Sequence, residues 1–157
     1  MKPIYIPNYY SLNLFDHLLN DIKWLEATEA RKEYFMSSYP RSYKYGGDGP
    51  GGRTYESSLY TLPVMELLNK LNNDFNCNYN VCFLNRYDNQ KNQLGWHSDN
   101  SPEMNPEHPI AVISFGAERE IWWKNKDATG EIPKDQRQVF INLFCFFLQR
   151  FKNDDVL

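Results

Sequence analysis

Residues 85–99 read Asn-Arg-Tyr-Asp-Asn-Gln-Lys-Asn-Gln-Leu-Gly-Trp-His-Ser-Asp. The stretch ends in a His-x-Asp triplet, and we predict a strand over residues 94–99. Successive side chains of a strand point to opposite faces, so His97 and Asp99 would share one face. A neutral imidazole and a carboxylate are two of the three donors that hold non-haem Fe(II) in a facial triad. The stretch therefore predicts a metal site that lacks an evident third donor, because no histidine follows His108 in these 157 residues.

The overall composition is that of one globular domain. With 157 residues, 41% hydrophobic and 24% charged, the chain is long enough to bury a core and is not disordered in character. We expect a single domain over residues 1–157 and a monomer. The formal net charge is −3. Non-specific binding to a phosphate backbone therefore requires a local basic patch.

The cysteines and the apolar segments bear on location. Cys77, Cys82 and Cys145 are odd in number and lack metal-type spacing. We therefore expect reduced thiols in a cytoplasmic protein. The longest apolar stretch, residues 139–148, is shorter than the roughly 20 residues that a membrane-spanning helix needs. We expect no membrane partner.

Residue spacing predicts an α+β chain. Apolar residues at helical spacing predict one helix over residues 11–27 and a second from a Thr61 cap to residues 72–76. Glycines and prolines mark residues 31–60 as a loop or a loosely paired hairpin. Short apolar runs predict strands over residues 79–87, 94–99, 110–117 and 119–124. Helices followed by short strands favour a jelly-roll-like pair of sheets.

Several short motifs follow one another in a fixed order. They are Tyr39-Pro40-Arg41, Tyr45-Gly46, Arg53-Thr54-Tyr55, Asn85-Arg86-Tyr87, Gly95-Trp96-His97-Ser98-Asp99 and Ile113-Ser114-Phe115-Gly116-Ala117. In this order the sequence resembles the AlkB family of Fe(II)/2-oxoglutarate-dependent dioxygenases over about residues 35–126. The resemblance implies a double-stranded β-helix (jelly-roll) core with two N-terminal helices packed on it. It also implies Fe(II), 2-oxoglutarate and O₂, used to hydroxylate N-alkyl groups on a flipped base of DNA or RNA.

The resemblance assigns roles residue by residue. His97 and Asp99 match the first two iron ligands of the catalytic site. Asn85-Arg86-Tyr87 matches the segment that binds 2-oxoglutarate, with Asn85 and Tyr87 as the contacts. Because these two residues stand two apart on a predicted strand, their side chains would face the same interior.

The resemblance also places a nucleotide-recognition lid in residues 39–60. The substrate-binding candidates are Tyr45, Arg53, Thr54, Tyr55 and, beyond the lid, Ser101. Five Lys or Arg against two Asp or Glu give residues 31–55 a local balance of +3. Cations suit phosphate contacts and aromatic rings can stack on a base. A glycine-rich surface loop with exposed tyrosines is the alternative. Ser101 stands where repair enzymes of the family often carry an acidic residue.

The end of the chain departs from the family pattern. The family continues with a distal histidine and with an arginine that clamps the far carboxylate of 2-oxoglutarate, whereas residues 139–157 match no family motif. We therefore expect truncation or alteration after about residue 138 and a jelly roll that is incomplete at its C-terminus. Residues 139–148 would either fill the missing sheet position or expose an apolar patch. The alternative function is an inactive remnant that acts at most as a weak nucleic-acid-binding module.

Overall fold

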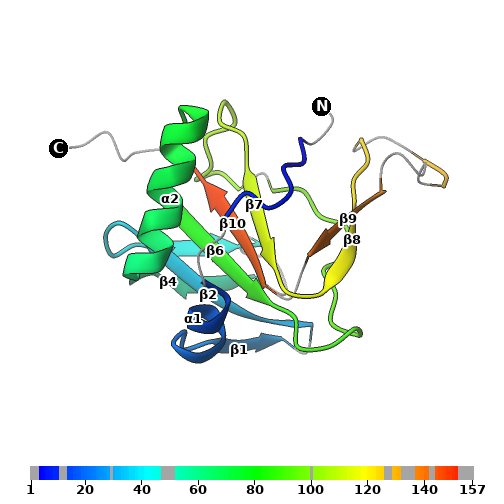
Figure 1. Cartoon of the computed structure of the whole chain (residues 1–157), viewed down its shortest axis with the longest axis horizontal. Helices are drawn as coiled ribbons and strands as arrows, with labels where there is room; N and C mark the ends of the chain where they lie inside the picture. The colour runs from blue at the N-terminus through cyan, green and yellow to red at the C-terminus, as the bar shows by residue number, and fades with distance from the viewer. Residues whose placement is uncertain are drawn as a thin grey trace.

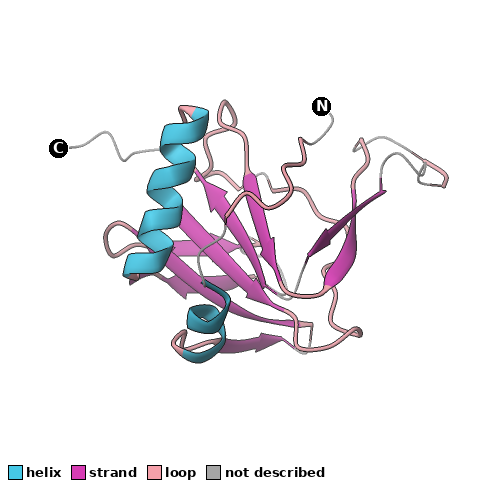
Figure 2. Cartoon of the chain, viewed as in Figure 1, coloured by secondary structure: helices cyan, strands magenta, loops and turns pink. Residues whose placement is uncertain are grey.

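The computed structural model describes residues 4–10, 14–28, 30–46, 52–99, 101–125, 129–131, 137–141 and 144–151. Within them the chain forms two helices and ten strands, which confirms the predicted α+β class (Figure 1, Figure 2). In order these are α1 (Leu14–Asn20), β1 (Leu25–Thr28), β2 (Arg31–Ser37), β3 (Ser42–Tyr45), β4 (Arg53–Glu56), β5 (Ser58–Leu59), α2 (Leu62–Phe75), β6 (Val81–Arg86), β7 (Ala111–Phe115), β8 (Glu118–Trp122), β9 (Arg137–Ile141) and β10 (Phe144–Gln149). No helix among the described residues is long and apolar enough to cross a membrane.

One large sheet organises the molecule. Its strand order is β1-β2-β6-β10-β7, with neighbours antiparallel, and β5 pairs in parallel with β2. Two small antiparallel pairs, β3–β4 and β8–β9, complete the strands. The centre of the sheet is therefore β6, which pairs with β2 on one side and with β10 on the other.

The two helices cover one face of this sheet, with α2 in front of β6 in Figure 1. The predicted apolar stripe of α2 is confirmed, because Val64, Leu67, Leu68 and Leu71 are all buried. The helix ends at Asn76, whose left-handed φ of 48° lets its backbone N–H bond the carbonyl of Asn72. Thr61 precedes the helix as predicted, but its hydroxyl bonds His17 Nε2 of α1 at 2.9 Å instead of capping α2.

The first helix is much shorter than predicted. It covers only Leu14–Asn20, whereas the apolar spacing predicted residues 11–27, of which 11–13 lie outside the described residues. The indole of Trp24 folds back to donate to the Leu18 carbonyl at 2.8 Å. From Leu25 the chain pairs with β2 as strand β1. Tertiary pairing thus overrides the helical spacing of the last predicted turns.

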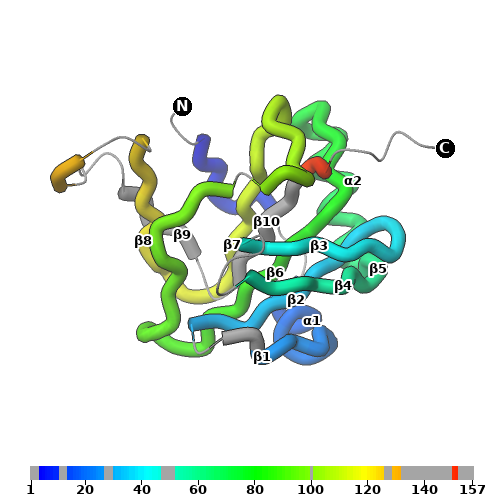
Figure 3. Tube along the Cα trace, turned by 180° about the vertical axis from the view of Figure 1, so that it is seen from behind, coloured from blue at the N-terminus to red at the C-terminus, as the bar shows by residue number. Residues whose placement is uncertain are grey.

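The other face of the sheet is covered by the β3–β4 hairpin, which Figure 3 shows crossing β2 and β6. Its inward residues Tyr43 and Tyr55 join a second buried cluster with Phe35, Val81, Met104 and Phe151. The predicted hairpin within residues 31–60 is confirmed. The prediction of a loop over residues 31–37 is wrong, because this segment is β2, which pairs with β6 over residues 32–37.

Strands β9 and β10, the last two in the sequence, both pair with earlier strands. β9 pairs with β8, and β10 lies between β6 and β7, with Phe146 opposite Leu84 on one side and Ile113 on the other. Of the two predictions for residues 139–148, the one in which the segment fills a sheet position is confirmed for the described residues. Residues 144–149, which carry no family motif, therefore form an internal strand of the large sheet.

Candidate active site

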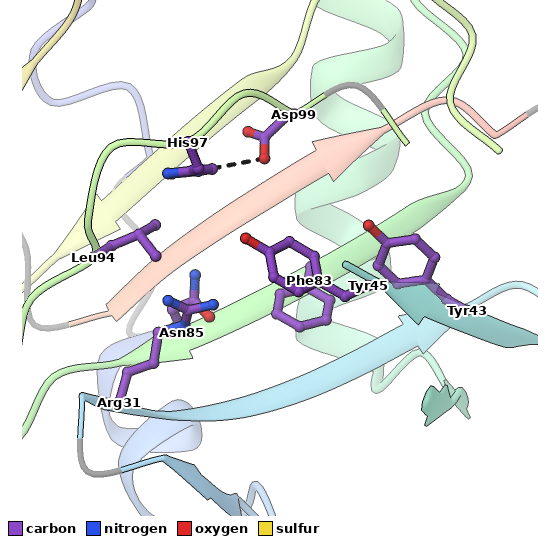
Figure 4. A pocket seen from close by; sticks show the side chains of 8 residues that line it. All are labelled: Arg31, Tyr43, Tyr45, Phe83, Asn85, Leu94, His97 and Asp99. Atoms are coloured by element: carbon purple, nitrogen blue, oxygen red, sulfur yellow. Dashed lines mark ion pairs between the residues drawn. The ribbon is translucent and has the colours of Figure 1, made fainter. Parts of the chain in front are cut away.

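A pocket that is open to solvent lies on the hairpin side of the sheet. It is lined by residues from β2, β3, β6 and the loop before β7: Arg31, Tyr43, Tyr45, Phe83, Asn85, Leu94, His97 and Asp99 (Figure 4). Four of the residues that the sequence proposed for the site, Tyr45, Asn85, His97 and Asp99, meet here. The pocket thus joins the two ends of the 85–99 stretch.

His97 and Asp99 occupy a loop, so the predicted strand over residues 94–99 is wrong. None of the strands described pairs with this segment; within it, His97 Nδ1 lies 2.9 Å from the Gly95 carbonyl. The guanidinium of Arg119 bonds the Asn92 carbonyl at 2.8 Å, just before the loop. The two side chains still converge, with His97 Nε2 3.4 Å from Asp99 Oδ1 (Figure 4). The loop therefore achieves the common orientation that strand alternation was expected to provide.

The pair is only partly shielded from solvent, with exposed side-chain fractions of 29% for His97 and 24% for Asp99. The hydrogen bond with Asp99 raises the pKa of His97 above its ordinary value, although burial and the charge of Arg31 oppose the rise. A cation that binds the imidazole nitrogen must displace a proton from the protonated form. The pair is consequently a site at which a metal ion and a proton compete.

Asn85 supplies a buried polar group to the same pocket. It lies on β6, directly opposite Glu33 of β2 and Cys145 of β10, and is 2% exposed. Its Oδ1 has no hydrogen-bond partner among the described residues. An unsatisfied buried polar atom costs about 1–3 kcal/mol. A group that donates a hydrogen bond is therefore what this atom of the pocket wall favours.

A cluster of charges sits beside Asn85. Glu33 is fully buried, and its carboxylate lies 2.6 Å from Arg31 Nη2 and 3.2 Å from Arg53 Nη1. Tyr55 also donates its hydroxyl hydrogen to Glu33. Burial and this bond raise the pKa of Tyr55, which keeps the phenol protonated as a donor. Arg53 and Tyr55, which were proposed to bind substrate, thus contact Glu33, the residue opposite Asn85.

The remaining candidates do not line the pocket. Arg86 bonds Asp88 at 2.6 Å, and Tyr87 is buried with the guanidinium of Arg119 5.6 Å from its ring centre. Thr54 is exposed on β4. The hydroxyl of Ser101 lies 2.6 Å from that of Tyr43. Their assigned roles stay predictions.

Comparison with known proteins extends this geometry. The family model described as 2OG-Fe(II) oxygenase superfamily matches residues 4–141. The chain belongs to this superfamily. The match contains every residue that lines the pocket and ends close to residue 138, after which the sequence lacked family motifs.

Named relatives are of the AlkB type, which confirms the resemblance seen in the sequence. The chain is 29% identical over 127 residues to the human DNA oxidative demethylase ALKBH2, covering 76% of this chain and 49% of that protein. It is 29% identical over 118 residues to the cattle alpha-ketoglutarate-dependent dioxygenase alkB homolog 3, covering 73% and 41%. It is 27% identical over 133 residues to the Arabidopsis thaliana ALKBH2, covering 78% and 41%. The chain spans about half the length of the curated relatives it matches.

As a 2OG-Fe(II) oxygenase, the chain carries a partial donor set. Imidazole and carboxylate suit Fe(II), and the side-chain amide nitrogen of Asn85 is a donor that suits an oxygen-rich ligand. The described residues contain no group of three His, Cys, Asp or Glu placed to hold a metal ion. His108 does not line the pocket. The described residues therefore offer Fe(II) two protein ligands, His97 and Asp99.

Sequence reasoning missed four lining residues, Arg31, Tyr43, Phe83 and Leu94. Phe83 and Asn85 alternate on β6, so the spacing that placed Asn85 could have placed Phe83. Arg31 and Glu33 are opposite charges two residues apart, a spacing that places both on one face of a strand. This charge spacing could have located Arg31 only if residues 31–37 had been predicted to form a strand.

Proposed function

We propose that this chain is an oxidative nucleic-acid dealkylase that uses Fe(II), 2-oxoglutarate and O₂. The observation that carries the proposal is the convergence of His97, Asp99 and Asn85 on one pocket. Membership of the 2OG-Fe(II) oxygenase superfamily supports the same chemistry. The printed names of the relatives, a DNA oxidative demethylase and an alkB homolog, support the substrate class.

The chain's own residues would divide the work as follows. His97 and Asp99 would hold the metal through an imidazole nitrogen and a carboxylate oxygen. Asn85 would donate a hydrogen bond from its side-chain amide nitrogen to an oxygen of the co-substrate. Tyr45 and Phe83 would provide an aromatic wall that limits the access of water. Bound Fe(II), with 2-oxoglutarate and O₂, supplies the oxidising power for hydroxylating an N-alkyl carbon.

The proposal includes the finer fold. The superfamily implies a jelly-roll core, and we infer that the large sheet and the β8–β9 pair are its two sheets. The helices α1 and α2 would then be the N-terminal cover of the larger sheet. The position of β10 between β6 and β7 supports a sheet that is continuous on this side.

The outer surface of the β3–β4 hairpin is the proposed contact for nucleic acid. Tyr43 and Tyr55 point inward and are buried, whereas their strand neighbours Lys44 and Thr54 are exposed and directly opposite each other. Nearby, the Arg41 guanidinium lies 4.1 Å from the centre of the exposed Tyr39 ring. A cation beside an aromatic face suits a phosphate and a base. The lid would therefore contact substrate with its outer residues.

A second candidate is a non-catalytic module that binds nucleic acid through this lid. The observation that favours it is the absence of a third metal donor among the described residues. Two protein ligands hold iron less selectively than a completed triad. Both candidates predict binding of nucleic acid, and only the first predicts turnover.

The experiment measures succinate formed from 2-oxoglutarate by the purified chain with Fe(II) and O₂, beside salt-dependent binding to methylated and unmethylated oligonucleotides. His97→Ala should abolish turnover, whereas the control His108→Ala, outside the pocket, should retain it. Binding without turnover above the His97→Ala level would favour the non-catalytic module. If the chain shows no binding and no turnover, both candidate functions are excluded.

A further inference from the structure

We propose that Arg31 binds the distal carboxylate of 2-oxoglutarate. The proposal rests on the proposed function and names the residue that recognises the far end of the co-substrate. The superfamily resemblance led us to expect this cation late in the chain. The structure instead offers one from the first residue of β2, an element that the sequence did not predict.

The position of Arg31 is the first support. It lines the pocket together with Asn85, His97 and Asp99, and its side chain is 10% exposed. Strand alternation places Arg31 on the same face of β2 as Glu33, which stands directly opposite Asn85. A ligand held at His97 and Asp99 would therefore share the pocket with this guanidinium.

The charge balance is the second support. Glu33 is the one carboxylate between two guanidinium groups, 2.6 Å from Arg31 and 3.2 Å from Arg53. The formal charges of these three groups sum to +1. The Glu33 contact would hold the Arg31 guanidinium in place for a ligand carboxylate. A planar guanidinium is suited to two parallel bonds with a carboxylate.

The placement of the late arginine is the third support. The backbone carbonyl of Arg150 accepts from the Asn105 amide at 2.8 Å, and Arg150 does not line the pocket. Among the residues described, Arg31 is the arginine that does. The cation for the distal carboxylate would thus come from β2, on one side of β6, whereas Arg150 follows β10, on the other side.

The test compares two ligands by calorimetric titration into the full chain with Mn(II). They are 2-oxoglutarate and 2-oxopentanoate, which keeps the oxo acid but lacks the distal carboxylate. The wild-type chain should prefer 2-oxoglutarate by about 10- to 100-fold, the range of a charged hydrogen-bonded pair. Arg31→Met should remove this preference, and Arg31→Lys should keep part of it. The control Arg150→Met removes an arginine that does not line the pocket and should keep the preference.

Circular dichroism and thermal unfolding establish that each variant is folded. If Arg31→Met is unfolded, Arg31→Lys decides, since it keeps a charge beside Glu33 but loses the planar fork. An unchanged preference in the folded variant would overturn the role of Arg31 while leaving the proposed function intact. A wild-type chain that binds both ligands equally would do the same. A wild-type chain that neither binds 2-oxoglutarate nor forms succinate would overturn the proposed function as well.

Discussion

The hydroxyl of Tyr43 lies 2.6 Å from the hydroxyl of Ser101, which joins the β3–β4 hairpin to the segment that follows Asp99, a proposed metal ligand. Tyr43 is also one wall of the pocket. A single hydrogen bond thus connects the proposed nucleic-acid contact to the proposed metal site.

Removal of this bond should cost a measurable amount of stability. Tyr43→Phe and Ser101→Ala should each lower the free energy of unfolding by about 1 kcal/mol, and the double variant should cost less than the sum. Urea unfolding of the four proteins gives the coupling free energy. Tyr34→Phe is the control: it loses a similar bond of 2.8 Å to Ser58 outside the pocket, and its loss of stability should add to that of Ser101→Ala. Strictly additive losses would show that the two hydroxyls do not interact.

The buried carboxylate of Glu33 should be essential for folding. Glu33→Gln leaves the guanidinium groups of Arg31 and Arg53 without their anion, and breaking a buried pair typically costs about 3–5 kcal/mol. Glu26→Gln is the matched control, because Glu26 is 74% exposed and pairs with Lys32 at the surface. That variant should change stability by less than about 1 kcal/mol. Equal urea midpoints for the two variants would refute a structural role for the Glu33 cluster.

Asp88 should make the stability of the loop after β6 depend on pH. Desolvation raises the pKa of Asp88, but hydrogen bonds from Lys32 and Arg86 outweigh it, so the pKa lies below its ordinary value. The stabilisation is present above the pKa of the unfolded chain and is lost as pH falls through the lower pKa of the folded chain. Asp88→Asn should therefore be less stable than wild type near pH 7 and match it near pH 2. A stability difference that is independent of pH would contradict this assignment.

Strand β10 should be required for the sheet. Phe146→Pro removes a backbone donor from a strand that pairs on both sides, a position where proline is not tolerated. The variant should lose its cooperative thermal transition. Phe146→Ile keeps the donor and a strand-favouring side chain, and it should remain folded. Cooperative unfolding of the proline variant near the wild-type temperature would show that β10 does not belong to the sheet.

Local patterns predicted the parts of the fold that depend on one segment. The spacing of Val64, Leu67, Leu68 and Leu71 suffices for α2, because a helix satisfies its own backbone. Strand β2 was missed since its buried face carries Arg31 and Glu33, and only pairing with each other and with Arg53 makes such charges compatible with burial. The apolar alternation that reveals a strand is therefore absent.

The candidate site was predictable only in part for the same reason. Asn85, His97 and Asp99 belong to one short stretch, so motif and spacing brought them together before the structure did. Arg31 and Tyr43 reach the pocket only through the pairing of β2 with β6 and the folding of the hairpin over them. Contacts between segments so far apart carry no local signal.

The most direct test of the account measures methyl removal from an N-methylated oligonucleotide by the purified chain with Fe(II), 2-oxoglutarate and O₂. The account predicts formaldehyde release that requires 2-oxoglutarate, is lost in His97→Ala and Asp99→Ala, and is retained in His108→Ala. Folded wild-type protein that releases no more formaldehyde than His97→Ala would contradict it.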